Sequence, residues 1–469
     1  MQEAILNIVA KANAYLSDYI LIFLLVGVGL FYSFKTRFVQ VRCFGEGMKK
    51  VFGNIKFRGG KQEGGLSSFQ ALATAIAAQV GTGNIVGASG AILVGGPGAI
   101  FWMWVIAFLG MATIYAEAVL AQETKVMDAD GNVAGGPVYY IRKAFPNGFG
   151  KFLSAFFSVA TVLALGFMGT MVQSNSIAES CNTAFGIPGW LVGLILVAVS
   201  AFIFLGGIQR IASVTEKLVP VMACLFLAGG LVILVCRIQF VPQTLGMIFK
   251  YAFTPSALIG GGIGYALKTA ISQGAKRGLF SNEAGMGSTP HAHAMANVAK
   301  PHDQCVVAMI GVFIDTFVVL TMTALVVITC LYTEGGILAG LEGEAYLAAT
   351  SGAAAVVSKT SAMQMAVGSV FGTGFGNIFV AICLLFFAFS TILGWNFFGR
   401  LNVEYLSKKN KAAVAIYSVV AIAFIFLGTI LKNDLVWELT DFFNYLMVLP
   451  NAIALFALSK LVKKSSDNK

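Results

Sequence analysis

The residues best suited to chemistry are small and uncharged polar side chains that interrupt an apolar stretch between Ala71 and Asn84. The stretch ends in Gln79-Val-Gly-Thr-Gly-Asn84, so glycines and hydrogen-bonding groups fall within a segment that otherwise favours a helix. A helix that unwinds there frees backbone amides and carbonyls, which are costly to leave unpaired in hydrocarbon. Such groups are tolerated where they line a cavity or bind a ligand. The pattern therefore predicts a binding site at an unwound helix.

The two sides of such a break suit groups of opposite charge. Carbonyls that end the first half-helix suit a cation, and amides that open the second half suit a carboxylate, helped by the helix dipole. A zwitterionic amino acid beside a sodium ion would satisfy both sides. Close helix packing is the alternative role for the glycines. The predicted cation ligands here are the carbonyls of Ala77 and Val80, and the predicted substrate-binding residues are Gln79, Gly81, Thr82, Gly83 and Asn84.

A second segment, Ala266-Leu-Lys-Thr-Ala-Ile-Ser-Gln-Gly-Ala-Lys-Arg-Gly278, repeats the pattern Ala-Leu-x-Thr-Ala-Ile of the first and also runs into glycines. Interrupted apolar segments at corresponding positions of two halves are typical of secondary transporters. We therefore expect a second break here, flanked by Ser272, Gln273 and Gly274, which would meet the amino group of the substrate. Lys276 and Arg277 would follow that break as inner-gate or topology charges.

The composition indicates that these residues lie on membrane-spanning helices. Of 469 residues, 58% are hydrophobic and 11% are charged, against roughly 25% charged in soluble domains. Apolar runs of nearly the ~20 residues that span a bilayer predict an all-α polytopic membrane protein. The eleven predicted spans lie near residues 15–34, 66–93, 97–122, 152–178, 188–206, 212–235, 258–290, 303–332, 373–400, 411–430 and 435–460.

Charge gives this scheme an orientation. With the N-terminus outside, most of the 31 Lys and Arg residues fall on one face, which predicts that this face and the C-terminus are cytoplasmic and that the protein is a multi-pass protein of the cell membrane. The predicted organisation is an N-terminal transmembrane helix with a basic cytoplasmic loop (1–65), a first five-helix repeat (66–235), a second, inverted five-helix repeat (236–460) and a cytoplasmic tail (461–469).

Three longer motifs resemble those of a known family. They are Gly81-Thr-Gly-Asn-Ile-Val-Gly87, Gly95-Gly-Pro-Gly-Ala-Ile-Phe-Trp-Met-Trp-Val-Ile-Ala-Phe-Leu-Gly110 and Gly274-Ala-Lys-Arg-Gly-Leu-Phe-Ser-Asn-Glu-Ala-Gly-Met-Gly-Ser288. On these the chain resembles the alanine or glycine:cation symporter family, which is sodium:alanine symporter-like and belongs to the LeuT-fold superfamily. The resemblance implies a LeuT-like 5+5 inverted repeat with two broken helices, here preceded by one extra N-terminal helix. It also implies import of alanine or glycine coupled to sodium, or less often to protons.

The resemblance further implies where a sodium ion would bind. The sequence Phe386-Phe-Ala-Phe-Ser-Thr391 in the ninth span looks like the helix that completes a sodium site. Its expected ligands are the Ala388 carbonyl and the Ser390 and Thr391 hydroxyls, opposite the carbonyls of the first break. Oxygen ligands suit a hard cation. Hydrogen bonds from the two hydroxyls to their own helix are the structural alternative.

Four further polar or aromatic residues lie in apolar spans. Asp315 would need a partner or a proton to offset its cost in the membrane; it is a possible second cation ligand, a protonatable group in a proton-coupled permease of the same fold, or a structural hydrogen-bonding residue. Glu117 is interpreted as a brace that accepts amides of the unwound segments. Gln173 and Trp395 are predicted walls of the substrate site, with Trp395 limiting side-chain size or simply packing.

Other classes of function find less support. The seven cysteines are interpreted as small apolar residues, and His291, His293 and His302 as parts of an ordinary cytoplasmic loop without a cysteine or acidic set to bind metal. Neither a Walker loop nor a nucleophile and base pair stands out, so the sequence predicts neither ATP use nor an enzyme. An ion channel would require symmetric filter repeats. The expected partners are a small amino acid, sodium and the lipid bilayer, with no nucleic acid and no obligatory protein partner.

Overall fold

The structure is a computed structural model, and it is described here at residues 2–53, 65–127, 133–260, 262–352 and 355–467. The chain begins with α1 (Gln2–Tyr15), the π-helical segment η1 (Leu16–Leu21), α2 (Ile22–Lys35), α3 (Val39–Arg42), α4 (Phe44–Phe52), α5 (Ser68–Gln79), the π-helical η2 (Gly83–Gly87), α6 (Ala88–Gly95) and α7 (Ala99–Thr124). A short antiparallel pair, β1 (Val126–Met127) and β2 (Val133–Ala134), follows, with Val126 opposite Ala134.

The middle of the chain continues with helices only. It contains α8 (Pro137–Ala144), α9 (Gly148–Thr161), the π-helical η3 (Val162–Gly169), α10 (Thr170–Phe185), α11 (Gly189–Leu205), α12 (Gly207–Cys236), the 3-10 turn η4 (Ile238–Phe240), α13 (Val241–Phe253), α14 (Ser256–Ile259), α15 (Ile263–Asn282) and α16 (Pro290–Ala294). The last part contains α17 (Pro301–Val312), the π-helical η5 (Phe313–Leu320), α18 (Thr321–Leu331), α19 (Gly343–Thr350), α20 (Ala362–Phe371), α21 (Thr373–Leu406), α22 (Lys411–Gly428), α23 (Asn433–Ala457) and α24 (Ser459–Asp467).

The predicted membrane spans can be compared with these helices. Among the described residues, eight helices are long and apolar enough to cross a bilayer, and α5 with η2–α6, bent by 46°, makes a ninth. The two remaining predicted spans correspond to α11, an apolar helix of 17 residues, and α15, a helix of 20 residues. Helix α15 carries Lys268, Lys276 and Arg277, which lower its hydropathy. A mostly helical membrane protein is confirmed, with one short β pair, whereas the count of eleven spans stays a prediction.

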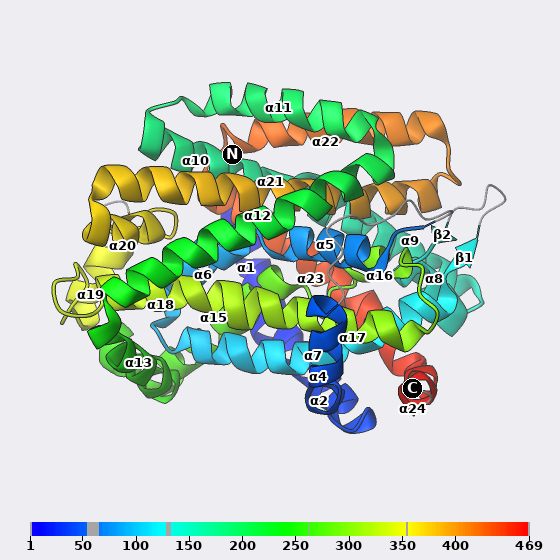
Figure 1. The fold of residues 1–469 in the computed structure, drawn as a ribbon, viewed down its shortest axis with the longest axis horizontal. Coiled ribbons are helices and arrows are strands. Elements are labelled where there is room, and N and C mark those ends of the chain that lie inside the picture. Colours follow the sequence, from blue (N-terminus) through cyan, green and yellow to red (C-terminus); the bar gives the residue numbers. More distant parts are fainter. Residues whose placement is uncertain (1, 54–64, 128–132, 261, 353–354, 468–469) are drawn as a thin grey trace.

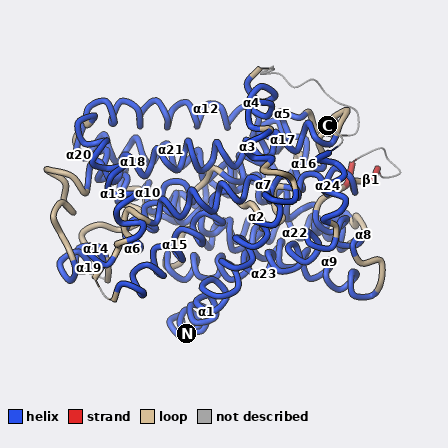
Figure 2. Tube along the Cα trace, turned by 90° about the horizontal axis from the view of Figure 1, so that it is seen from below, coloured by secondary structure: helices blue, strands red, loops and turns tan. Residues whose placement is uncertain are grey.

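The long helices lie along one direction of the molecule, and short elements collect at its two ends. Figure 1 shows α21 and α17 running along the horizontal axis and α12 crossing them obliquely, with α13, α19 and α20 at one end and α8, α16, β1–β2 and α24 at the other. The same separation is visible from below in Figure 2. Helices α7 and α21 carry the most continuous buried stretches, so the core surrounds them. The broken helix α5–α6 is buried almost throughout.

Candidate functional site

The first predicted break is present. Helix α5 ends at Gln79, the backbone of Val80 leaves helical geometry at φ −81° and ψ 89°, and helical structure resumes at Gly83. The Gly81 amide donates to Asn84 Oδ1 at 2.9 Å. The Thr82 amide donates to Gln173 Oε1 at 3.1 Å, and the Thr82 hydroxyl donates to the same oxygen. The amides freed by the break are therefore satisfied by the amide side chains of Asn84 and Gln173.

The second break lies elsewhere than predicted. Helix α15 continues through Ser272–Gly278 and ends at Asn282, followed by a turn in which Glu283, Gly285 and Gly287 have positive φ. The expected break at Gln273–Gly278 is therefore wrong. Gly274 serves packing instead, because a Cβ there would lie 2.5 Å from Trp102 Cβ on α7.

The residues expected beside that second break consequently lie away from it. The Ser272 hydroxyl donates to Asp18 Oδ1 at 2.6 Å, and Lys268 also pairs with Asp18, at 3.0 Å. The Cβ of Gln273 lies 3.3 Å from where a Cβ on Gly95 would be, at the far end of α6. The substrate contacts proposed for Ser272, Gln273 and Gly274 thus have no support from their positions.

The two observed breaks face each other. Gln79 Nε2 donates to the Asn282 carbonyl, the last of α15, at 2.7 Å. A Cβ on Gly83 would lie 3.0 Å from Phe280 and 3.2 Å from Ser281 Cα, so glycine favours this close approach. Helix α15 packs on α6, while α16 packs on α5. The segments before and after the first break are therefore paired crosswise with those before and after the second.

Asp315 connects both breaks from the side. Its carboxylate accepts from Asn84 Nδ2 at 2.7 Å, from the Ser281 hydroxyl at 2.9 Å and from the Thr316 hydroxyl at 2.9 Å. Asp315 is fully buried. Hydrogen bonds of this kind are the partners that a carboxylate inside a membrane requires. Since Asn84 also accepts the Gly81 amide, the position of Asp315 determines the geometry of the first break.

The expected sodium ligands of α21 lie against the first break. Thr391 Oγ1 is 2.8 Å from the Ala77 carbonyl and 3.4 Å from the Val80 carbonyl, and Ser390 Oγ is 3.4 Å from the Ala77 carbonyl. Both hydroxyls also reach the Phe387 carbonyl of their own helix. Ala388 is fully buried one turn before Thr391. Four of the five predicted oxygen positions, those of Ala77, Val80, Ser390 and Thr391, are thus brought together, and their role as sodium ligands stays a prediction.

Two buried acids hold the second break. Glu117 on α7 accepts from the Gly285 amide at 3.2 Å and from Asn451 Nδ2, and Asn451 also donates to the Gly285 carbonyl at 2.9 Å. Glu283 itself accepts from the Ser288 hydroxyl and from the indole Nε1 of Trp395. Glu283 has a left-handed backbone conformation (φ 58°), which is uncommon for a glutamate and indicates a constrained position.

Sequence reasoning singled out Glu117 and Trp395 but missed Ser281, Asn282, Glu283 and Asn451. A signal was present in Asn282-Glu-Ala-Gly-Met-Gly287, where two glycines follow a polar pair and so favour a helix end. Asn451 carries no comparable local signal, since it follows Pro450 within α23 and meets the break only through the fold.

Two polar atoms of side chains that flank the first break have no hydrogen-bond partner in the described structure. They are Gln79 Oε1 and Gln173 Nε2, both buried. One is an acceptor and the other a donor, on the two side chains that flank the unwound Gly81–Thr82. Because buried polar groups are nearly always paired, such atoms indicate water or a ligand.

The two ends of the broken helix α5–α6 differ: the α6 end is covered by side chains, whereas a cavity lies beside the α5 end. On the α6 side, Arg277 pairs with Asp441 at 2.9 Å and lies over the ring of Trp437, which packs on Phe280. The side chains of Arg277 and Asp441 are 14% and 5% exposed. Because the break follows Asn282, Lys276 and Arg277 precede it, contrary to the inner-gate interpretation. Burial lowers the pKa of nearby Lys359, and Asp434 beside it opposes this shift.

On the α5 side there is a cavity of about 240 Å³, with Ser68, Leu72, Asp303 and Val307 in its lining. A Cβ added to Gly311 would lie 3.5 Å from Leu72 Cδ1 and 3.3 Å from Gln79 Oε1. Leu72, which lines this cavity, thus lies near the unpaired oxygen as well.

Comparison with known proteins identifies the chain at the level of its family. A profile of the sodium:alanine symporter family matches residues 2–468. The chain belongs to the sodium:alanine symporter family. It is 39% identical over 457 residues to the sodium/alanine symporter AgcS of Methanococcus maripaludis, covering 97% of this chain and 95% of the relative.

Two relatives from Bacillus subtilis are named for a different cation or a different substrate than AgcS. The chain is 40% identical over 458 residues to YrbD, named for a sodium/proton-dependent alanine carrier, with 97% and 90% coverage. It is 37% identical over 462 residues to GlnT, named for a sodium/glutamine symporter, with 98% and 90% coverage. These similarities indicate a membrane-embedded amino-acid transporter rather than an enzyme.

A solved structure confirms the fold. The crystal structure of MhsT in complex with L-phenylalanine superposes with a TM-score of 0.59 at 14% identity, covering 87% of this chain and 96% of that one. The chain therefore shares the LeuT-type fold.

Proposed function

We propose that this protein imports a small neutral amino acid, alanine or glycine, together with sodium by alternating access. The observation that carries the proposal is the pair of unpaired atoms, Gln79 Oε1 and Gln173 Nε2, flanking an unwound helix at the centre of the bundle. A zwitterion offers an ammonium donor to the first and a carboxylate acceptor to the second. The carboxylate would also compete with Gln173 Oε1 for the Thr82 amide.

Sodium would occupy the oxygen cluster between α5 and α21. The carbonyls of Ala77, Val80 and Ala388 and the hydroxyls of Ser390 and Thr391 are its proposed ligands, an oxygen-only set appropriate for a hard cation. Thr391 Oγ1 now donates to the Ala77 carbonyl at 2.8 Å. With sodium bound, that hydroxyl hydrogen would turn away so that the lone pairs of both oxygens face the ion.

A small substrate is favoured by the aromatic residues near the break. The Trp395 ring meets Phe280 edge to face at 5.8 Å between centroids and is fixed by its hydrogen bond to Glu283. A Cβ at Gly169 would lie 2.4 Å from the same indole, so the ring has little room to withdraw. This supports the proposal that Trp395 limits the substrate side chain.

The proposed transport cycle uses the unequal ends of the site. The cavity lined by Leu72 would be the cytoplasmic path, and the layer formed by Arg277, Asp441 and Trp437 the outer barrier. This assigns the basic end with α24 to the cytoplasm, with the N-terminus outside. The crosswise contacts of α5–α16 and α6–α15 support the division into inverted repeats 66–235 and 236–460.

Proton coupling is the alternative, and Asp315 is the residue that favours it. Its carboxylate is buried between both breaks and hydrogen-bonded to Asn84 of the first. A proton arriving there would weaken the acceptor that holds Asn84 and so would change the geometry of the first break. Sodium coupling remains the leading proposal because the oxygen cluster around Thr391 supplies a separate cation site.

Direct binding tests the proposal. Titration of purified protein with L-alanine should give tighter binding in sodium than in choline buffer, and alanine should tighten sodium binding by the same factor, because the coupling is reciprocal. Thr391→Ala should remove this coupling. A matched control is Thr440→Ala, a buried threonine whose hydroxyl donates to the Val436 carbonyl of its own helix. Alanine binding that is identical in both buffers would overturn the sodium assignment.

A further inference from the structure

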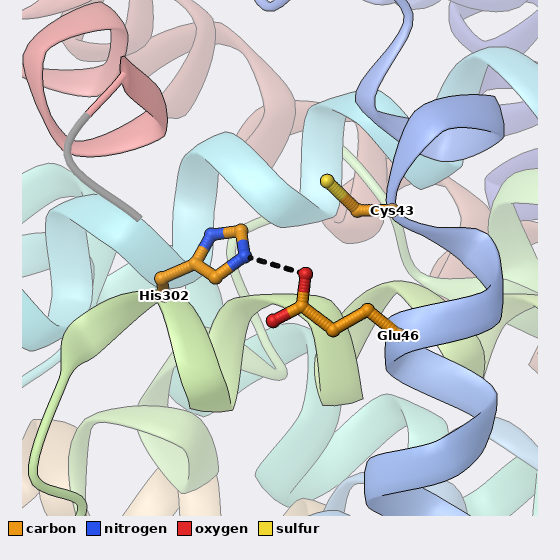
Figure 3. A group of neighbouring side chains, drawn as sticks. All are labelled: Cys43, Glu46 and His302. Atoms are coloured by element: carbon orange, nitrogen blue, oxygen red, sulfur yellow. Dashed lines mark hydrogen bonds and ion pairs between the residues drawn. The ribbon is translucent and has the colours of Figure 1, made fainter.

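Three side chains with metal-binding atoms meet where α4 packs on α17. Cys43 immediately precedes α4, Glu46 lies in its first turn, and His302 is the second residue of α17. Figure 3 shows the three side chains converging from these two helices. A ligand atom from each lies within 4.8 Å of the others. Cys43 and Glu46 therefore bring a thiol and a carboxylate to His302 from a distant part of the sequence.

The imidazole is oriented as a ligand would be. His302 Nδ1 lies 2.7 Å from the hydroxyl of Tyr115, and Nε2 lies 3.3 Å from Glu46 Oε2. The Cys43 thiol also hydrogen-bonds to the imidazole. Metal-binding histidines almost always have their other nitrogen held by such an outer hydrogen bond, which fixes the ring and its tautomer. Tyr115 is fully buried and supplies that bond here.

We propose that Cys43, Glu46 and His302 bind a divalent transition metal, with Zn²⁺ as the matching ion. Tetrahedral zinc at about 2.0–2.3 Å from its ligands places them roughly 3.3–3.7 Å apart. The observed 3.3 Å between Glu46 and His302 already meets this spacing. The thiol has to approach by at most about 1 Å, which rotation about its Cα–Cβ bond allows. Mixed sulfur, nitrogen and oxygen donors suit zinc.

Access and proton balance are consistent with reversible binding. The Glu46 side chain is 37% exposed, which gives the ion a path from solvent, whereas His302 is 4% exposed. Binding would release the thiol proton and any proton on Nε2, and water would complete the fourth position. The site lies about 20 Å along the α17–η5 helix from Asp315, at 1.5 Å per residue, so it is separate from the proposed transport site.

A bound metal ion would hold helices α4 and α17 together. Helix α4 is already joined to α17 by the ion pair of Lys50 with Asp303, at 2.9 Å. A metal held by residues of both helices adds a second, stronger tie one turn away. Both ion-pair residues also line the 240 Å³ cavity, so the bound metal would stabilise one wall of it.

Cobalt(II) provides a direct test because its thiolate complexes absorb light, whereas those of zinc do not. Titration of the purified full-length protein with Co²⁺ should give a sulfur-to-cobalt charge-transfer band that saturates at one ion per chain and is removed by Zn²⁺. Cys43→Ser should abolish the band. Cys305→Ser is the matched control, because its thiol lies on α17 but donates to the Pro301 carbonyl. Tyr115→Phe should weaken Zn²⁺ affinity about 10–100-fold.

A second readout guards against variants that fold poorly. Zn²⁺ should raise the melting temperature of the wild type and of Cys305→Ser. It should leave the melting temperature of Glu46→Gln, which changes the partly exposed ligand of the site, nearly unchanged. Absence of a thiolate band in the folded wild type, a band that persists in Cys43→Ser, or a band lost in Cys305→Ser would each overturn the assignment.

Discussion

Gly81 lies between the proposed sodium and substrate sites, and replacing it by alanine tests their geometry with one methyl group. A Cβ there would lie 2.3 Å from Thr391 Oγ1, 3.0 Å from Thr391 Cβ and 3.2 Å from Gln173 Oε1. Ordinary contacts begin at 3.4 Å, so the hydroxyl must retreat by about 1 Å. That movement displaces it from the carbonyls of Ala77 and Val80. Gly81→Ala should therefore damage the sodium site more than the fold.

The expected magnitude follows from the overlap. Inserting a methyl group into a well-packed interior costs about 1–3 kcal/mol. If this cost falls on the sodium-bound geometry, the half-saturating sodium concentration should rise roughly 5–150-fold, at about 1.4 kcal/mol per factor of ten. The maximal uptake at saturating sodium should change less.

The assay is labelled alanine uptake into proteoliposomes at graded external sodium. Gly90→Ala is the matched control, because it lies on the same broken span and its nearest neighbour, Lys359 Cβ, would be at 3.4 Å. A folded Gly81→Ala protein with the wild-type sodium titration would refute the proposed arrangement of Thr391 against the break.

Three other substitutions address neighbouring claims. Asp315→Asn keeps an oxygen for Asn84 Nδ2 but places an NH2 group where the Ser281 and Thr316 hydroxyls now donate. Both hydroxyls can turn to accept, so sodium-driven uptake should persist with affinity reduced about fivefold; complete loss of uptake with intact alanine binding would favour proton coupling. Gln173→Leu removes the Nε2 donor proposed for the substrate carboxylate and should raise the half-saturating alanine concentration about 10–100-fold in the same assay; an unchanged value would remove Gln173 from the substrate site. Arg277→Gln leaves buried Asp441 unpaired and should cost about 3–5 kcal/mol of stability in thermal unfolding. Adding Asp441→Asn should restore part of that loss, and a purely additive double variant would contradict the pairing.

The sequence predicted the first break correctly because its signal is local. Gly81 and Gly83 fall between the hydrogen-bonding side chains of Gln79, Thr82 and Asn84, and no ordinary apolar helix needs that combination. The membrane class and most spans follow from hydropathy in the same way.

The second break lies beyond its predicted position because the repeated Ala-Leu-x-Thr-Ala-Ile aligns the two helices but not their breaks. Gly274 in fact allows α15 to cross α7 closely, so that helix continues to Asn282. Glycine serves both roles, and the choice depends on a neighbour, Trp102, that is far away in the sequence. The roles of Glu283 and Asn451 depend on the same long-range packing.

Uptake against a gradient tests the central claim most directly. Proteoliposomes containing the purified protein should accumulate labelled alanine or glycine above the external concentration when sodium is imposed outside, and should release it when the sodium gradient is dissipated. An interior-negative potential should increase the accumulation, since one charge is worth about 2.3 kcal/mol per 100 mV. Uptake that ignores sodium and follows an imposed pH gradient, or conduction without saturable uptake, would contradict the account.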